Sequence, residues 1–328
     1  MPEFRFITSS DEHQAEKAPG FRNPGYKDQI FEKLVWQGTI AKKVKAHAVL
    51  RIGDFFDSKT ASRTTHSLVA EAAKIHRGYP CETLSVVGNH DMAYNDIGTV
   101  DKQPLGVLYK AGIFGLVDKT YESGDFKVRV VGVDYMPDLD VDGLHDIVRK
   151  KDENITIAAV HLLAGMAPEE KIQSFFKEKI FDYRDLVFEG CPDVYVFGHY
   201  HKDQGIVEHM GVKFVNLGAV SRGALTFENL ERKPKISYIK ATPNGVSVEE
   251  MIVPHKDASE VFDLELKKRL VKERITINEF IQKYQEHKNL SSESSMQERL
   301  ASLDKFPEDL RRVIMELVEI GAAEAEQD

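Results

Sequence analysis

The stretch Leu84-Ser85-Val86-Val87-Gly88-Asn89-His90-Asp91 joins a short apolar run directly to an amide, an imidazole and a carboxylate. The apolar part is rich in valine and ends at a glycine, which is typical of a buried strand. In open α/β sheets, ligand-binding side chains gather in the loops beyond the carboxyl ends of the strands. The stretch therefore predicts an α/β fold in which Asn89 and His90 lie at the edge of a sheet.

Four other short apolar runs also end at side chains that can bind a metal. They lead into Asp11-Glu12-His13, Gly53-Asp54-Phe55-Phe56-Asp57, the lone His161 and Gly198-His199-Tyr200-His201. A single histidine beside a strand is more often an ordinary core or surface residue than a ligand. Five strand ends of this kind in one chain instead predict that their side chains converge on one crevice.

The mixture of side chains indicates the chemistry that this crevice would support. Carboxylate and amide oxygens combined with imidazoles suit a pair of divalent metal ions. Two such ions can activate a water molecule and hold a phosphate group at the same time. The sequence therefore favours phosphoester hydrolysis and says less about the substrate.

As a set, these runs resemble the motifs of the calcineurin-like metallophosphoesterase superfamily, over roughly residues 4–255. Within it the chain is most similar to nuclease subunits of the SbcD type, which act with an SMC-like ATPase in DNA break processing. The segment from Gly53 to Arg63 resembles their second motif and the start of the following helix. The third motif ends in Asp91, where related protein phosphatases carry Glu. Asp57-Ser58-Lys59 stands where those phosphatases have Asp-Arg-Gly.

The resemblance implies an α/β fold of the metallophosphoesterase type, a four-layer sandwich with two central mixed sheets flanked by helices. This nuclease domain would cover residues 1–256. Pro243-Asn244-Gly245 predicts a closing hairpin, and Thr60 or Ser62 is expected to cap the helix after the second motif. Residues 257–328 are predicted to form a small helical region.

The resemblance also implies a role for each candidate ligand. One metal would be bound by Asp11, His13 and His201, and the other by Asn89, His161 and His199. Asp54 would bridge the two metals, since a carboxylate has two oxygens. Manganese is the expected ion, with magnesium or another divalent metal as the alternative. The spacing of His199 and His201 agrees, because alternate side chains of an extended backbone share a face.

Four further residues are candidates for catalysis or substrate binding. The resemblance implies that His90 protonates the leaving oxygen or steadies the transition state, for which an imidazole is suited because its pKa lies near working pH. Asp57 would either support a metal ligand or begin the next helix. Asp91 would hold the His90 ring or cap the following turn, and Arg63 would contact a phosphate.

The composition agrees with a cytoplasmic enzyme without a membrane span, because no apolar run reaches the length of about 18 residues that a span needs. The start of the chain lacks the apolar core of a signal peptide. At first sight, the net charge of −9 argues against a nucleic-acid substrate, because nucleic acids are negatively charged. However, residues 257–328 hold 17 acidic and 11 basic residues and so account for −6 of it. Two divalent ions would add positive charge to the catalytic face, so DNA remains the expected substrate.

Residues 257–328 carry two apolar stripes at helical spacing, separated by a Ser-rich linker. The stripes consist of Phe280, Ile281 and Tyr284, and of Val313, Ile314 and Leu317. This tail resembles the helix-loop-helix by which SbcD-type nucleases dock onto the coiled coil of their SbcC-type ATPase. Packing on the chain's own core and a homodimer seam are the alternatives. Such nucleases usually place a DNA-capping domain before the tail, and here the sequence leaves no room for one.

Three hypotheses about function follow. The first is a two-metal DNA nuclease, acting as an exonuclease and single-strand endonuclease in DNA break processing, repair or recombination with an ATPase partner. The second is a small-molecule phosphodiesterase or a phosphatase of the same superfamily. The third is a mainly structural subunit of an ATPase–DNA complex, which the complete ligand set argues against.

Overall fold

In the computed structural model, the apolar runs of the sequence form two mixed sheets of six strands each. The first sheet has the order β14-β13-β1-β2-β3-β4. Its strands are β1 (Phe4–Ser9), β2 (Ala48–Ile52), β3 (Glu82–Val86), β4 (Phe114–Leu116), β13 (Lys235–Thr242) and β14 (Gly245–Ile252). Strands β1 to β4 are parallel, whereas β13 and β14 form the predicted antiparallel hairpin, in which Thr242 pairs with Gly245.

The second sheet has the order β11-β12-β10-β7-β6-β5. Its strands are β5 (Asp118–Ser123), β6 (Phe126–Val133), β7 (Ile155–Val160), β10 (Val194–Phe197), β11 (Asp203–His209) and β12 (Val212–Leu217). The four central strands, β6, β7, β10 and β12, are parallel, and the two edge strands pair antiparallel with them. Both sheets therefore keep a parallel centre, which brings the carboxyl ends of neighbouring strands to one edge.

The main core of the domain lies between the two sheets. Alternate residues along the strands point into this space, such as Leu50 and Ile52 of β2, and Ile157 and Ala159 of β7, and all four are buried. This alternation follows from the period of two of a β-strand. The sheets therefore pack face to face and fix the distance between their strand ends.

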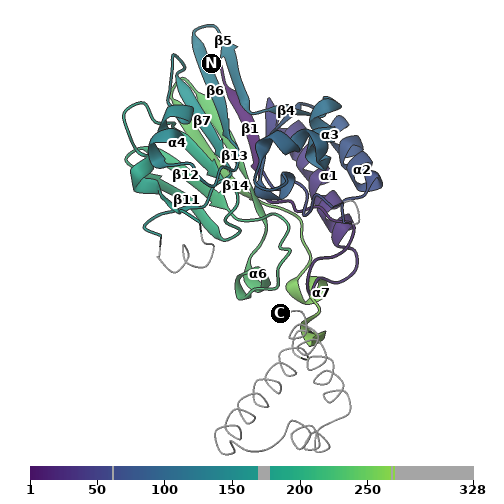
Figure 1. Cartoon of the computed structure of the whole chain (residues 1–328). Coiled ribbons are helices and arrows are strands. Elements are labelled where there is room, and N and C mark those ends of the chain that lie inside the picture. Colours follow the sequence, from purple (N-terminus) through teal and green to yellow (C-terminus); the bar gives the residue numbers. More distant parts are fainter. Residues whose placement is uncertain (61–62, 169–177, 267–268, 270–328) are drawn as a thin grey trace, which may run out of the picture. The chain divides into compact units, whose positions relative to one another are not determined.

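Helices cover the outer face of each sheet (Figure 1). Helices α1 (Tyr26–Val44), α2 (His66–Arg77) and α3 (Pro104–Lys110) pack on the first sheet. Helix α4 (Val141–Val148) and the 3-10 helix η3 (Tyr183–Leu186) pack on the second. The order helix, sheet, sheet, helix confirms the predicted four-layer α/β sandwich.

Several shorter helices and strands connect these elements. They are the 3-10 helices η1 (Asn89–Asp91) and η2 (Ile97–Lys102), the paired strands β8 (Ala164–Gly165) and β9 (Phe181–Asp182), and helices α6 (Phe227–Glu231) and α7 (Ala258–Val261). Helix α2 is capped by Thr65, whose side chain accepts a hydrogen bond from the backbone N–H of Leu68. The expectation of a cap at Thr60 was wrong, because its hydroxyl contacts Ser58 at 3.0 Å.

The structure describes residues 1–60, 63–168, 178–266 and 269, so the other expected cap, Ser62, lies outside it. The chain divides into two compact units, Met1–Leu264 and Glu265–Asp328. The tail helices expected around Phe280 and Val313 lie outside the described residues, and the boundary after residue 256 stays a prediction. Within the described ranges, no helix combines the length and apolar character needed to cross a membrane.

Candidate metal centre

The candidate ligands lie in loops that follow five strands, three from the first sheet and two from the second. The loops after β1, β2 and β3 carry Asp11, Asp54 and Asn89, and those after β7 and β10 carry His161 and His199. The two sheets touch here, because the Nδ1–H of His161 donates to the carbonyl of Ile52 at 2.6 Å. The backbone N–H of His199 also donates to Asp11 Oδ1 at 3.2 Å.

Four of the candidate ligands adopt the left-handed backbone conformation that side chains other than glycine rarely adopt. Their φ angles are 54° at Asp11, 44° at His13, 52° at Asp54 and 76° at His199. Strained positions of this kind cluster at functional sites. The glycine of the third motif has a related role, since a Cβ at Gly88 would overlap the Asp54 carboxylate.

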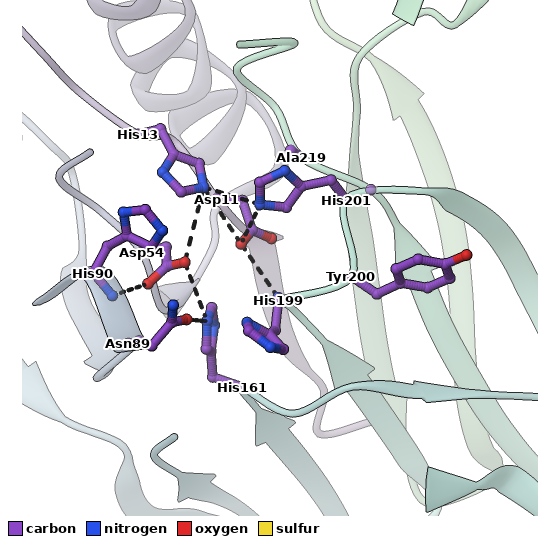
Figure 2. Close-up of polar contacts among 12 residues, drawn as sticks. Asp11, His13, Asp54, Asn89, His90, His161, His199, Tyr200, His201 and Ala219 are labelled. Carbon is purple, nitrogen blue, oxygen red and sulfur yellow. Dashed lines mark hydrogen bonds and ion pairs between the residues drawn. The ribbon is translucent and has the colours of Figure 1, made fainter. Parts of the chain in front are cut away.

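Asp11, His13 and His201 form a first group of potential ligands (Figure 2). The Nε2 atoms of His13 and His201 lie 3.0 Å apart. Asp11 Oδ1 is 3.5 Å from Nε2 of His201 and 3.9 Å from Nε2 of His13. Tyr200, between His199 and His201 in sequence, points away from this group (Figure 2), although the left-handed backbone at His199 shows that the expected extended conformation is not what places these side chains.

Asn89, His161 and His199 form a second group (Figure 2). The Nε2 of His161 lies 3.3 Å from Asn89 Oδ1 and 3.4 Å from Asp54 Oδ2. One potential ligand atom each from Asp54, His161 and His199 lies within 4.8 Å of the other two. Because Nδ1 of His161 is bound to a backbone carbonyl, Nε2 is the nitrogen that this ring offers to a metal.

Asp54 belongs to both groups of side chains. Its Oδ2 lies 3.4 Å from Nε2 of His161 and 3.8 Å from Nε2 of His13. Its Oδ1 accepts a hydrogen bond from the backbone N–H of His90 at 2.8 Å. The structure therefore brings all seven candidate ligands together, with one carboxylate between two sets of imidazoles.

The proximity of these groups shifts their proton affinities. Burial alone would raise the pKa of Asp11, but the hydrogen bond and charge of His201 lower it to about 2. Burial also lowers the pKa of His161, but the Asp54 carboxylate outweighs it and raises the pKa to about 9. Burial, together with the neighbouring His201, lowers the pKa of His13 to about 3. Despite burial, the pKa of Asp54 is lowered as well, chiefly by His161, so both carboxylates are ionised as metal binding requires, whereas His161 has to release its proton before it can bind a metal.

The ring of His90 lies beside the first group. Its Nδ1–H donates to the backbone carbonyl of Asp57 at 2.7 Å, and its ring centroid is 4.8 Å from that of His13. This hydrogen bond fixes the orientation of the ring, so Nε2 is the nitrogen that can exchange a proton with a substrate. His90 also forms a third group with His13 and Asp57, in which one potential ligand atom of each residue lies within 4.8 Å of the other two.

Asp57 and Asp91 support the loops around His90. Asp57 Oδ1 lies 3.7 Å from Nδ1 of His13, and Asp57 Oδ2 accepts a hydrogen bond from Arg63 at 2.6 Å. Asp91 is buried and accepts backbone N–H groups of Gly88 at 3.1 Å and of Phe55 and Phe56 at 3.3 Å.

Asp91 thus holds the second motif against the third, a contact that was not among the expected ones. Burial, together with the charge of Asp54, raises the pKa of Asp91 to about 7.

The sequence did not point to three residues that also contact the site. The Tyr26 hydroxyl donates to the carbonyl of His13 at 2.8 Å. The ring of Tyr135, which follows β6, lies 5.2 Å from that of His199. Glu178 Oε2 lies 2.8 Å from Nε2 of His199. The strand-end rule would have found Tyr135, whereas nothing in the sequence around Glu178 indicates its position.

The arrangement of donors fits divalent metal ions. Ligand atoms at about 2.1 Å from a metal lie about 3.0 to 3.4 Å from their neighbours. Several pairs here have such separations, including the 3.0 Å between His13 and His201 and the 3.4 Å between His161 and Asp54. Among the described side chains, Asp11 Oδ2 is buried without a hydrogen-bond partner, as expected of an oxygen that faces a cation.

Comparisons with known proteins found one matching family model and several similar solved structures. No curated protein sequence matches the chain. Similar solved structures include a purple acid phosphatase from yellow lupin (Lupinus luteus) seeds, at 12% identity and a TM-score of 0.47, covering 78% of this chain and 53% of the lupin chain. They also include a dimetal phosphatase from Danio rerio, at 12% identity and a TM-score of 0.45, covering 77% of this chain and 99% of the fish chain.

The family model described as calcineurin-like phosphoesterase matches residues 4–203. That match spans more than half of the sequence and includes every strand that carries a candidate ligand, so the chain belongs to the calcineurin-like phosphoesterase family.

Proposed function

We propose that this protein is a two-metal-dependent phosphodiesterase, and specifically a DNA exonuclease and single-strand endonuclease that acts with an SMC-like ATPase. The observation that carries the two-metal phosphoesterase assignment is the position of Asp54, whose carboxylate lies between His13 and His161. A carboxylate in this position can join two metal ions, and the remaining imidazoles and oxygens complete a ligand set on each side.

Bound metals would supply an activated water and positive charge for the phosphate. Asp11, His13 and His201 would hold one ion and Asn89, His161 and His199 the other. Asn89 is a neutral ligand, so it adds an oxygen without cancelling the positive charge that attracts a phosphodiester. His90 is held by the Asp57 carbonyl, which positions the ring to protonate the leaving oxygen or to stabilise the transition state.

Features near the second and third motifs support a nucleic-acid substrate. Asp57-Ser58-Lys59 and Asp91 follow the pattern of SbcD-type nucleases rather than that of the related protein phosphatases. The Arg63 side chain is 46% exposed although it pairs with Asp57, so its guanidinium can also reach a phosphate. The ATPase partner is proposed from the apolar stripes of residues 257–328 alone.

The test is metal-dependent hydrolysis by the full-length protein. Labelled single-stranded and double-stranded DNA, bis-p-nitrophenyl phosphate and p-nitrophenyl phosphate would be incubated with manganese or magnesium. We expect the diester and DNA to be cleaved and the monoester to be a poor substrate. An Asp54→Asn variant serves as the control for contaminating nucleases. Cleavage of the small diester but never of DNA would favour a small-molecule phosphodiesterase, and preference for the monoester would favour a phosphatase.

A further inference from the structure

Three neighbouring parallel strands of the second sheet end in a cluster of rings. Strands β6, β7 and β10 lead to Tyr135, His161 and His199, respectively. The ring centroids of Tyr135 and His199 lie 5.2 Å apart, and so do those of His161 and His199. Tyr135 is therefore packed against one of the candidate metal ligands, although it has no part in the proposed reaction.

Glu178 reaches this cluster from the segment before β9. Its Oε2 lies 2.8 Å from Nε2 of His199, and the carboxylate also accepts a hydrogen bond from the hydroxyl of Tyr135. The Glu178 carboxylate therefore joins the His199 ring to the Tyr135 hydroxyl.

The neighbouring His161 shows how a ligand ring is held in this site. A metal-binding imidazole uses one nitrogen for the metal, and its other N–H usually donates to a carbonyl or a carboxylate, which fixes the tautomer and the orientation. In His161, Nδ1–H donates to the Ile52 carbonyl and Nε2 faces Asp54 and Asn89. In His199 it is Nε2 that contacts an acceptor, and that acceptor is Glu178.

We propose that Glu178 is the positioning residue of His199: it accepts the Nε2–H, so that Nδ1 is the nitrogen that His199 offers to the metal. Tyr135 holds the Glu178 carboxylate in place by donating its hydroxyl proton. The proposal rests on the proposed function, because that function makes His199 a metal ligand.

Two observations favour this role over direct coordination or a surface ion pair. Among the described residues, Glu178 belongs to none of the groups whose carboxylate and imidazole atoms gather within 4.8 Å, whereas His199 belongs to one with Asp54 and His161. The Glu178 side chain is 27% exposed and that of His199 is 8% exposed. The contact is therefore shielded from water on the histidine side, where a charge-assisted hydrogen bond is strongest.

The experiment measures metal binding rather than turnover. Metal-free full-length protein would be titrated with manganese by isothermal calorimetry, and the magnetically coupled manganese pair would be followed by electron paramagnetic resonance. The variants are Glu178→Gln, Glu178→Ala and Tyr135→Phe. Glu189→Gln is the matched control, because Glu189 is an exposed glutamate of the same half of the chain. Thermal unfolding of each metal-free variant reports on folding.

We expect Glu178→Ala to weaken the second metal about 10- to 100-fold while the first metal binds as in the wild type. Glu178→Gln and Tyr135→Phe should act in the same direction with smaller effects, and the coupled-pair signal should fall in parallel.

The proposal is overturned if the Glu178 variants bind both metals like the wild type, or if both metals weaken equally. Complete loss of the second metal in Glu178→Gln would make Glu178 a direct ligand, which also overturns it. Failure of the proposed function looks different, because the wild-type protein itself would then bind fewer than two metals.

Discussion

The Asp54 carboxylate lies 3.4 Å from Nε2 of His161, although the two residues follow strands of different sheets. Asp54 also approaches His13 of the first group, at 3.8 Å. The carboxylate of Asp54 therefore lies within 4 Å of an imidazole nitrogen from each of the two groups.

The first prediction concerns that side chain. Asp54→Ala should weaken both metals by more than about 10-fold, because it removes a ligand shared by the two sites. Calorimetric titration with manganese would measure this, with Asp101→Ala as a control at an exposed carboxylate that pairs with Lys110. If one metal were lost and the other retained its affinity, Asp54 would be a ligand of a single metal and not a bridge.

The second prediction concerns His90, whose ring is held by the Asp57 carbonyl. His90→Gln should keep both metals and reduce cleavage of a diester by roughly 10²- to 10⁴-fold, which is the usual contribution of a general acid. Steady-state kinetics and metal content would be measured on the same preparation. Loss of a metal would make His90 a ligand, and an unchanged rate would remove it from the mechanism.

The third prediction concerns stability. Arg51 and Glu12 are fully buried and form an ion pair at 2.7 Å directly beside the first ligand motif. Arg51→Met should lower the free energy of unfolding by about 3–5 kcal/mol, because it leaves the Glu12 charge buried without its partner. The exposed pair of Lys110 and Asp101 provides the control, and Lys110→Met should cost at most about 1 kcal/mol. If urea denaturation showed that Arg51→Met and Lys110→Met lower the free energy of unfolding equally, burial of the Arg51–Glu12 pair would not explain its contribution to stability.

The fourth prediction is a pH dependence that arises from His76. Its Nε2 accepts a hydrogen bond from Arg51 at 3.1 Å, and its Nδ1–H donates to the Ala72 carbonyl at 2.8 Å. Burial and the charge of Arg51 hold the pKa of His76 well below its ordinary value of 6.5. The unfolded chain therefore binds a proton below pH 6.5 that the folded protein does not bind, so stability falls as the pH decreases.

We expect the free energy of unfolding of the metal-free protein to decrease below pH 6.5 by up to about 1.4 kcal/mol per pH unit from this residue. His76→Gln keeps an acceptor for Arg51 and does not titrate. The difference in stability between wild type and variant, measured by urea denaturation, should therefore shift in favour of the variant between pH 7 and pH 5. A difference that does not change with pH would show that His76 has the same pKa in the folded and the unfolded protein, which would contradict the prediction.

The fold could be predicted from the sequence because each ligand motif follows an apolar strand. The run before Asn89 forms β3, and the runs before Asp54 and His161 form β2 and β7. The turn residues Pro243 and Asn244 predicted the closing hairpin, which β13 and β14 form in the structure. Local pattern sufficed in these places because the strand and its loop are adjacent in the chain.

Other features depend on contacts between distant segments, and the sequence did not indicate them. Glu178 contacts His199 across 21 positions, and Asp91 binds backbone groups of Phe55 and Phe56 rather than its neighbour's ring. The cap of α2 was misplaced because several hydroxyl residues precede that helix, and only the path of the loop selects Thr65. In each case the side chain has several possible partners, and tertiary packing decides among them.

The last prediction concerns the tail. Phe262 is buried in the first unit, and the Arg22 guanidinium lies 5.2 Å from its ring. The backbone N–H of Asn23 also donates to the carbonyl of Val261 at 2.9 Å. A cut near residue 258 would therefore remove part of the first unit, and the structure places the better cut after Leu264.

Truncation after Leu264 should leave a folded protein that binds two metals and hydrolyses bis-p-nitrophenyl phosphate at about the wild-type rate, since all seven candidate ligands lie in the first unit. The same truncation should abolish association with an SMC-like ATPase and reduce processive degradation of DNA, because the apolar stripes of the tail need a surface to pack on. Circular dichroism, light scattering and the diesterase assay would be run on both proteins. An insoluble truncated protein would show that the stripes belong to the core. A monomeric truncated protein beside a dimeric full-length chain would show that they form a homodimer seam, and either result would contradict docking onto an ATPase.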